Sequence, residues 1–395
     1  MEWGPNMRKL STMISWLTLA VTLLGCFCFA AAQTSKNVSK TLKGPGTVIV
    51  HPALGGTIFG FDVDQNGTEG LLSEAIGSGE CPYATETFDQ KTGKIIKVVR
   101  KGKSVGCGDD DVTWGIVGSS VGLVEHQHSP TFDHLEMSFP LLNPLEGNQV
   151  TGLWVTPEKK TAEIWGVSRN QGTPMNAFQV YDFSTMLFYV YGSDVAKNTF
   201  GPVIQIGSYP GIIGLNTKTN TAVVLASDGN DFGASYVNQV DLTSGKVKTF
   251  LGIGSGQVMG LAVDSEDDIA VTTTFVDTGV EFYDLKKQTG FEVILPFIPE
   301  NCDNACTGVD VEYDPIHKLF LVAQPISSQQ QNSNFSTIYV YNRKGTLLET
   351  LNGLNFVTQR FDVFPVHMAI HPSERSGFVD VTNSLGVGAI QSFTY

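Results

Sequence analysis

Thr57 to Asp62 reads T-I-F-G-F-D, and Thr337 to Asn342 reads T-I-Y-V-Y-N. Both stretches lead into a polar turn and then into a second apolar run. Looser copies begin at Gly279 (G-V-E-F-Y-D), Ala177 (A-F-Q-V-Y-D) and Val237 (V-N-Q-V-D-L). A short-strand phrase that recurs along a whole chain is typical of a repeat architecture. The sequence therefore predicts an all-β fold, organised as a single β-propeller.

A second phrase predicts where each blade begins: a small residue, an apolar–x–apolar triplet, and an acidic or turn residue. It begins at Thr151, Ile213, Met259 and Thr307, and more loosely at His367 and Tyr83. These starts favour six blades; strand phrases of the first type number about seven, so seven blades are the alternative. The segment from His367 offers only three strands. We therefore expect an N-terminal strand, near Thr47, to complete that sheet and close the ring.

The start of the chain is typical of a secretory signal peptide. Arg8 and Lys9 precede an uncharged run from Ile14 to Phe29, and the small residues Ala30–Ala32 follow. We expect cleavage after Ala32, a short tail over 33–45 and a propeller over 46–395. No later stretch is long and apolar enough for a transmembrane segment. The prediction is a secreted, extracellular protein, and a monomer.

The charge of the chain disfavours two classes of partner. The formal net charge is −14 at pH 7, and residues 1–32 carry one acid and two bases, so the mature chain carries −15. Nucleic-acid binding depends on basic patches. Nonspecific attachment to anionic membranes also depends on positive charge. We therefore expect neither nucleic acid nor an anionic membrane surface as a partner.

The cysteines and sequons fit a secreted protein. An even number of cysteines follows the signal segment, which predicts two disulfides. The four residues are Cys81, Cys107, Cys302 and Cys306. Three pairings are open, and Cys81–Cys107 with Cys302–Cys306 closes the shortest loops. N-glycosylation is predicted at Asn37, Asn66 and Asn334.

The predicted fold indicates where a ligand would bind. In a propeller the innermost strands line a central channel, so the residues around each blade start are candidate ligand-binding residues. They are Glu80, Thr151, Gln257, Met259, Thr307 and His367. The chain has no G-x-S-x-G elbow and no glycine-rich loop leading into a helix. A serine hydrolase and a nucleotide-binding protein are therefore disfavoured.

One segment resembles a family of enzymes. Ser78 to Tyr83, S-G-E-C-P-Y, is similar to the G-E-x-P opening of gluconolactonase-type (SMP-thirty) propellers. The resemblance implies a lactonase-type hydrolase in which Glu80 binds one divalent cation such as calcium. The later metal positions of that family differ here, because Thr151, Met259 and Thr307 precede the glycines where P-N-G or D-G is expected. Methionine supplies no oxygen ligand for a hard cation.

Another segment resembles a family of secreted fungal proteins. Gly147 to Trp154, G-N-Q-V-T-G-L-W, continues to Trp165–Asn170, W-G-V-S-R-N. This is similar to the corresponding blade of the six-bladed propellers grouped with the major Malassezia allergen and the trichothecene-cluster accessory protein. A Ser or Thr precedes the blade-start glycine in that group, as Thr151 and Thr307 do here. The resemblance implies ligand or lipid binding, beside secondary metabolism or host interaction, without an established catalytic site.

Three hypotheses follow. The first is a secreted propeller with no cofactor, no metal and no catalytic residue, which binds a small, largely apolar ligand such as a lipid, or a partner, at its central face. The second is the metal-dependent lactonase that uses Glu80. The third is a protein-interaction module that uses exposed loops such as 329–334.

Overall fold

The computed structural model describes strands and turns between Pro45 and Tyr395. The chain divides into two compact units, Met1–Ser39 and Lys40–Tyr395, and all described residues belong to the second. Between 104 and 203 only the backbone of the strands is described. The described ranges are 45–64, 68–76, 81–103, 109–117, 121–128, 135–137, 148–155, 163–170, 173–174, 181–182, 188–194, 199–206, 209–227, 234–255, 258–274, 279–296, 308–324, 337–354, 367–382 and 388–395.

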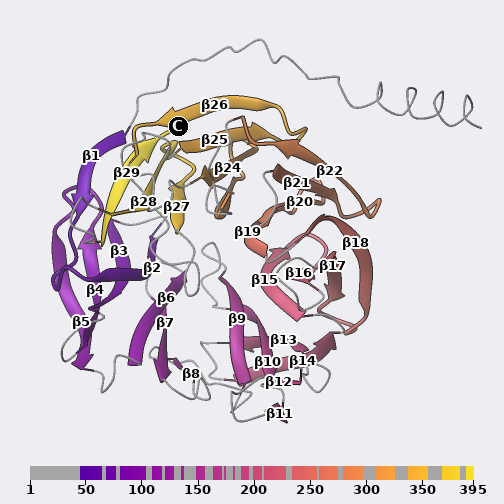
Figure 1. Ribbon diagram of the computed structural model, residues 1–395, viewed down its shortest axis with the longest axis horizontal. Helices are drawn as coiled ribbons and strands as arrows, with labels where there is room; N and C mark the ends of the chain where they lie inside the picture. Colours follow the sequence, from indigo (N-terminus) through magenta and orange to yellow (C-terminus); the bar gives the residue numbers. More distant parts are fainter. Residues whose placement is uncertain are drawn as a thin grey trace, which may run out of the picture. The chain divides into compact units, whose positions relative to one another are not determined.

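All the regular secondary structure within these ranges is β-strand (Figure 1). The strands form six four-stranded sheets, one three-stranded sheet and one two-stranded sheet. Neighbouring strands pair antiparallel, as in the hairpins β2–β3 and β19–β20. The predicted all-β class is confirmed, and the repeated four-stranded sheets are consistent with a propeller-like fold.

The sheets follow one another along the chain. In the N-terminal half, the first sheet contains β2 Thr57–Val63, β3 Glu69–Ala75, β4 Pro82–Asp89 and β5 Ile95–Lys103, and the second contains β6 Asp109–Val117, β7 Val121–His128 and β8 Leu135–Met137. The third sheet contains β9 Asn148–Val155, β10 Glu163–Asn170, β13 Phe188–Asp194 and β14 Thr199–Ile206. Strands β11 Thr173–Pro174 and β12 Tyr181–Asp182 form a separate pair. The C-terminal half contains β15 Tyr209–Asn216, β16 Thr221–Ser227, β17 Ala234–Asp241 and β18 Val247–Ser255; β19 Val258–Asp264, β20 Ile269–Thr274, β21 Gly279–Asp284 and β22 Thr289–Ile294; and β23 Asp310–Asp314, β24 Leu319–Gln324, β25 Thr337–Asn342 and β26 Leu347–Asn352.

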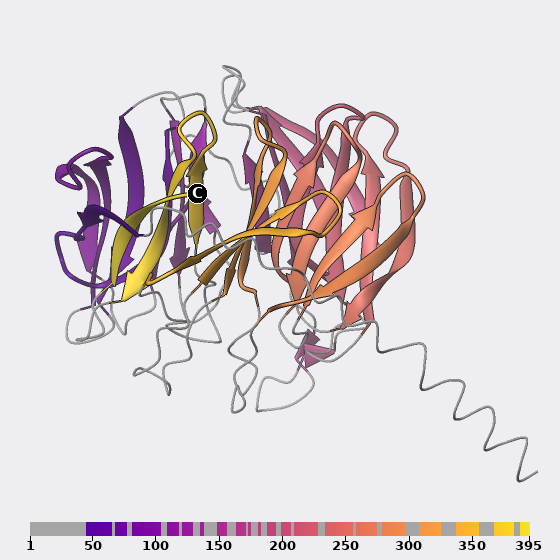
Figure 2. The same cartoon turned by 90° about the horizontal axis from the view of Figure 1, so that it is seen from above.

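The last sheet joins the two ends of the described chain. It contains β27 Met368–His371, β28 Ser376–Thr382, β29 Gly388–Thr394 and, at its edge, β1 Pro45–Val50. Val50 pairs with Ile390, and Ile49 pairs with Gln391. The predicted pairing of an N-terminal strand with the C-terminal sheet is therefore present. In Figure 2 this yellow sheet stands beside the indigo and purple sheet β2–β5, and β2 contacts both β27 and β29.

Burial changes in a regular way across a sheet. In β19 every second side chain is buried, whereas β20 and β21 are buried almost throughout, and β22 is almost wholly exposed. This gradient explains the sequence, because the third strand is covered on both faces and therefore reads as a continuous apolar run such as Ile338 to Tyr341. Figure 1 shows last strands such as β5, β18, β22 and β26 on the outside of the unit.

The hydrophobic core lies between neighbouring sheets. Val271 and Phe282 of one sheet pack with Phe320 and Tyr341 of the next. The same arrangement joins the first and last sheets, where Ile58, Leu72 and Phe88 pack with Phe378 and Ile390. In both cases apolar side chains of neighbouring sheets pack face to face, as they do between the blades of a propeller.

The structure corrects the assignment of two sequence phrases in the first sheet. The T-I-F-G-F-D stretch at Thr57 forms the first strand of its sheet, β2, whereas T-I-Y-V-Y-N forms a third strand, β25. The stretch at Tyr83, predicted to begin a blade, forms the third strand β4. The strand phrase and the blade-start phrase were confused because both contain alternating apolar residues and end in an acidic or turn-forming residue.

The acid at the end of a first strand has a defined structural role. Asp264 Oδ1 accepts hydrogen bonds from the backbone of Glu266 at 2.9 Å and of Asp267 at 3.4 Å. Asp314 Oδ1 repeats this arrangement after β23, with Ile316 N at 2.8 Å. Such a side chain closes the tight turn that returns the chain into the second strand. The acidic or turn residue in the blade-start phrase is therefore a turn-forming residue.

The small residue of the blade-start phrase also has a physical reason. A Cβ on Gly260 would lie 2.8 Å from Asp310 Cα and 2.8 Å from Val311 N, both backbone atoms of the next sheet. A Cβ on Gly214 would lie 2.7 Å from Val263 Cγ2 of the next sheet. The first strands of adjacent sheets come too close for a side chain at these positions.

Candidate functional site

The residues predicted to bind a ligand fall into three groups. Met259 in β19 is partly buried and packs against the core shared by β23–β26 and β27–β29. His367, directly before β27, contributes to a polar cluster described below. The remaining four are Thr151, whose backbone alone is described in β9, and Glu80, Gln257 and Thr307, which lie outside the described residues.

The predicted covalent features lie mostly outside the described part of the chain. Cys81 is buried and disulfide-bonded. Its partner remains a prediction. The residues outside the described ranges are Cys107, Cys302 and Cys306 together with the sequon residues Asn37, Asn66 and Asn334.

Four carboxyl groups from three sheets gather near the first strands. Asp310 and Glu312 lie two residues apart on β23, so they share one face of that strand. Burial raises the pKa of Glu312 well above its ordinary value, and the charges of Asp310 and of Asp62, on β2, raise it further. Burial followed by the charge of Asp310 likewise raises the pKa of Asp380, on β28. Negative charge on Asp310 or Asp62 therefore disfavours ionisation of Glu312, and negative charge on Asp310 disfavours ionisation of Asp380.

Backbone amides hold two of these carboxyls in place. Asp310 Oδ2 accepts a hydrogen bond from Met368 N at 2.7 Å, and Oδ1 accepts one from Val311 N at 2.8 Å. These two bonds oppose the effect of burial, which nevertheless raises the pKa of Asp310 to about 7. Asp380 Oδ2 accepts a hydrogen bond from His367 N at 3.1 Å. The contact between Asp310 and Met368 also ties β23 to β27 of the neighbouring sheet.

Two buried atoms of this group lack a hydrogen-bond partner in the described part of the chain: Asp380 Oδ1 and His367 Nε2. Asp380 is only 7% exposed, so water does not satisfy its second oxygen freely. Burial lowers the pKa of His367 to about 4, so this imidazole is neutral at pH 7. Buried polar atoms without partners are costly and mark sites where a bound group would be stabilising.

We name Asp62, Asp310, Glu312, His367 and Asp380 the carboxyl cluster. Only His367 was among the predicted ligand-binding residues. The sequence does carry a signal for the acids, because Asp310, Glu312 and Asp380 interrupt otherwise apolar strands, as in V-D-V-E-Y and F-V-D-V. A charged residue within a buried strand is rare unless it is paired or functional.

The described residues contain no group of three His, Cys, Asp or Glu side chains arranged to hold a metal ion. Glu80, the proposed metal ligand of the lactonase hypothesis, lies outside the described ranges. That hypothesis therefore stays a prediction.

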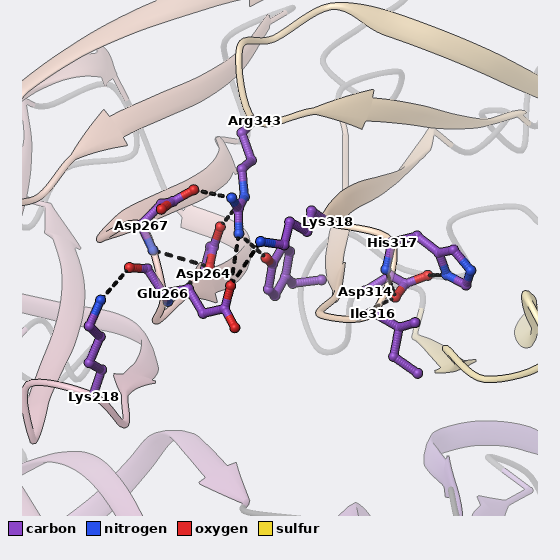
Figure 3. Close-up of polar contacts among 10 residues, drawn as sticks. Lys218, Asp264, Glu266, Asp267, Asp314, Ile316, His317, Lys318 and Arg343 are labelled. Atoms are coloured by element: carbon purple, nitrogen blue, oxygen red, sulfur yellow. Dashed lines mark hydrogen bonds and ion pairs between the residues drawn. The ribbon is translucent and has the colours of Figure 1, made fainter.

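A second charged group joins neighbouring sheets at their turns (Figure 3). Arg343, after β25, forms ion pairs with Asp264, the last residue of β19, and with Glu266 and Asp267 in the turn that follows. Arg343 also donates a hydrogen bond to Tyr313 Oη at 3.1 Å. The Asp264 side chain is fully buried, whereas the Arg343 side chain is 18% exposed.

Two lysines extend this group across a third sheet. Lys318 Nζ lies 3.0 Å from Glu266 Oε2, and Lys218, between β15 and β16, donates to the Glu266 carbonyl at 2.7 Å (Figure 3). The charges thus neutralise one another and link successive sheets. This group therefore serves the packing of the sheets, in contrast to the carboxyl cluster, in which like charges face each other.

Comparison with known proteins provides no family for this chain. No protein-family model matches it, and no curated protein has a matching sequence. Within the described ranges, no helix has the length and apolar character needed to span a membrane.

The carboxyl cluster predicts a pH dependence of stability. A carboxyl whose pKa is raised in the folded state stabilises the fold below its ordinary pKa, and this contribution is lost as pH rises through the raised value, about 7 for Asp310. We expect the free energy of unfolding to fall between pH 5 and pH 8. Replacing Glu312 with glutamine removes one of the facing charges. The variant should lose less stability over that range, by about 1 to 2 kcal/mol.

Urea unfolding at several pH values measures this effect. Glu374 lies exposed in the turn between β27 and β28, so Glu374→Gln is the matched control and should follow the unmodified protein. Equal pH profiles for Glu312→Gln and the unmodified protein would contradict the prediction.

Proposed function

We propose that Lys40–Tyr395 is a seven-bladed propeller closed by β1. The support comes from contacts between first strands of successive sheets. They run from β2 to β6, β9, β15, β19, β23 and β27, and β27 contacts β2 again. The prediction of six blades counted Tyr83 as a start and had no start at β6, where the sequence lacks the small-residue phrase. The pairing of β1 with β29 gives the last sheet four strands, like most others.

We further propose that the protein is a binding module and that the carboxyl cluster receives a positively charged, hydrogen-bond-donating group, such as the amine of a small organic molecule. The observation that carries this proposal is the unpartnered Asp380 Oδ1, which is buried and belongs to a carboxyl affected by the charge of Asp310. A cation that donates a hydrogen bond would satisfy this oxygen and relieve the repulsion between the carboxyls. Nε2 of the neutral His367 is a second polar atom available to the ligand.

The chemistry of the cluster refines the predicted ligand. A largely apolar molecule remains compatible with it if the molecule carries an amine at one end, since ligand sites combine apolar lining with a few polar groups. Secretion and a role beside fungal secondary metabolism or host interaction remain predictions from the sequence.

Binding can be tested with a charged ligand and its neutral counterpart. Isothermal titration calorimetry at pH 8 would compare phenethylamine with phenethyl alcohol, which has the same ring and chain length. We expect only the amine to bind. Asp380→Asn should weaken binding by about tenfold or more, because a charge-assisted hydrogen bond contributes roughly 1.5 to 3 kcal/mol.

Glu374→Gln is the control for a carboxyl outside the cluster and should leave the affinity unchanged. Circular dichroism and the midpoint of urea unfolding would establish that Asp380→Asn is folded, and Glu312→Gln serves as a second cluster variant. Equal binding of amine and alcohol, or unchanged amine binding by both cluster variants, would overturn the proposal. Calcium chloride would be titrated separately. Binding of calcium without binding of the amine would favour a metal site instead.

A further inference from the structure

Two glutamates form a buried pair in the first sheet, apart from the carboxyl cluster. Glu74 on β3 and Glu86 on β4 are both inaccessible to solvent. Leu72 pairs directly with Glu86, and Glu74 follows Leu72 by two residues on the same face of the sheet. The glutamates are therefore diagonal neighbours, a separation that their side chains can span.

Both carboxyls hold the segment 51–56, which connects β1 to β2. Leu54 N donates to Glu74 Oε1 at 2.7 Å, and Gly56 N donates to Glu74 Oε2 at 2.9 Å. Ala53 N donates to Glu86 Oε2 at 3.0 Å. Gly388 N, at the start of β29, donates to the Gly56 carbonyl at 3.1 Å. The segment therefore crosses from the sheet that holds both ends of the described chain to the first sheet, and the two glutamates fix its backbone there.

The two carboxyl groups offer more hydrogen-bond acceptor oxygens than the neighbouring groups offer donors. Glu86 Oε1 is buried and has no hydrogen-bond partner in the described ranges. Burial raises the pKa of both groups, and this effect outweighs the backbone hydrogen bonds from segment 51–56, which lower it; the charge of Glu74 raises the pKa of Glu86 further. Two ionised carboxylates at this place would repel each other without water to screen them.

The surrounding elements carry other charged groups. His51 lies exposed at the start of the crossing segment. Neighbouring strands carry Asp62 on β2 and Lys97, Arg100, Lys101 and Lys103 on β5. Strand β6, which contacts β3 and β4, carries Asp109, Asp110 and Asp111, whose side chains lie outside the described ones. The charge that acts on Glu86 in the described structure is that of Glu74.

We infer that Glu74 and Glu86 form a proton-dependent latch on segment 51–56, closed while the pair retains a proton and released when both carboxyls ionise. Protonation of one carboxyl removes the repulsion and leaves its carbonyl oxygen free to accept from an amide. The sign follows from the raised pKa values: the latch contributes its stability below the ordinary glutamate pKa and loses it as pH rises through the raised values. The contact between segment 51–56 and the two glutamates should therefore weaken toward alkaline pH.

Hydrogen exchange of the full chain, followed by mass spectrometry from pH 5 to pH 9, tests the latch. After correction for the intrinsic pH dependence of exchange, we expect protection of the amides of Ala53, Leu54 and Gly56 to fall by about tenfold or more. The amides of β20, which pair within another sheet, serve as an internal reference and should change by less than about threefold.

Two variants separate the latch from a merely structural role. Glu86→Gln keeps an oxygen for Ala53 N and removes one charge, so protection of segment 51–56 should become nearly independent of pH. In Glu74→Gln a side-chain NH2 group replaces one of the two oxygens that accept from Leu54 N and Gly56 N, so a donor would face a donor. Protection of the segment should therefore fall at every pH. Protection of the segment that does not change with pH in the unmodified protein would overturn the inference. The inference would also be overturned if protection of segment 51–56 in Glu86→Gln depended on pH as it does in the unmodified protein.

Discussion

Replacing Arg343 with methionine should lower the free energy of unfolding by about 3 to 5 kcal/mol, the cost of removing one partner from a buried ion pair. The reason is the position of Asp264, whose side chain is fully buried and whose ion-pair partner is the Arg343 guanidinium. Methionine retains much of the aliphatic stem and its packing. The loss therefore reports on a carboxylate left without its cation. Urea unfolding followed by tryptophan fluorescence measures it.

Lys318→Met is the matched control. Lys318 Nζ contacts Glu266 from the same set of turns, but both side chains are about half exposed or more, at 49% and 68%. An exposed pair of this kind contributes at most about 1 kcal/mol. If Arg343→Met costs no more than Lys318→Met, the buried pair with Asp264 does not stabilise the contact between sheets as argued.

Replacing Gly260 with alanine should also destabilise the protein strongly, by about 3 kcal/mol. The added methyl group would lie 2.8 Å from the backbone of Asp310 and Val311 in the next sheet. Backbone atoms cannot move aside as the end of a flexible side chain can. The two first strands must therefore separate, and Asp310, which belongs to the carboxyl cluster, would shift with them.

The neighbouring residue supplies a control for this prediction. Met259→Leu changes a partly buried side chain on the same strand without changing its volume much. Such exchanges cost less than about 1.5 kcal/mol. The thermal midpoint and the amine affinity should both fall in Gly260→Ala and stay close to the unmodified values in Met259→Leu. A Gly260→Ala protein as stable as Met259→Leu would contradict the close approach of the strands.

The sequence contains much of the fold, because local rules produce it. The phrase from Met259 to Asp264 places a glycine where sheets meet, alternating apolar residues where one face is buried, and an acid where the turn begins. Each feature recurs at a fixed position in the phrase, so each could be predicted from the sequence. The order of strands in the first sheet could not be predicted, because β2 and β25 have similar apolar patterns but different neighbours.

The candidate site was harder to predict, because its residues come from three sheets. His367 could be found because it stands at the start of a sheet, where a propeller exposes residues to its centre. Asp62 and Asp380 lie far apart in the sequence, and the fold brings each of them near an acid of β23, Asp62 near Glu312 and Asp380 near Asp310. Neither acid has a sequence motif, and only their occurrence within apolar strands distinguishes them.

The pairing of β1 with β29 has a consequence for how the protein is made. The first described strand finds its partner in the last strand of the chain, so a ribosome must finish nearly the whole polypeptide before this pairing can begin. Until then β1 and the segment that the two glutamates bind have no C-terminal neighbour, and the unpaired backbone of β1 is open to other chains. Chains that end early, before Gly388, would carry this exposed strand permanently. For this protein, incomplete synthesis and aggregation should therefore go together.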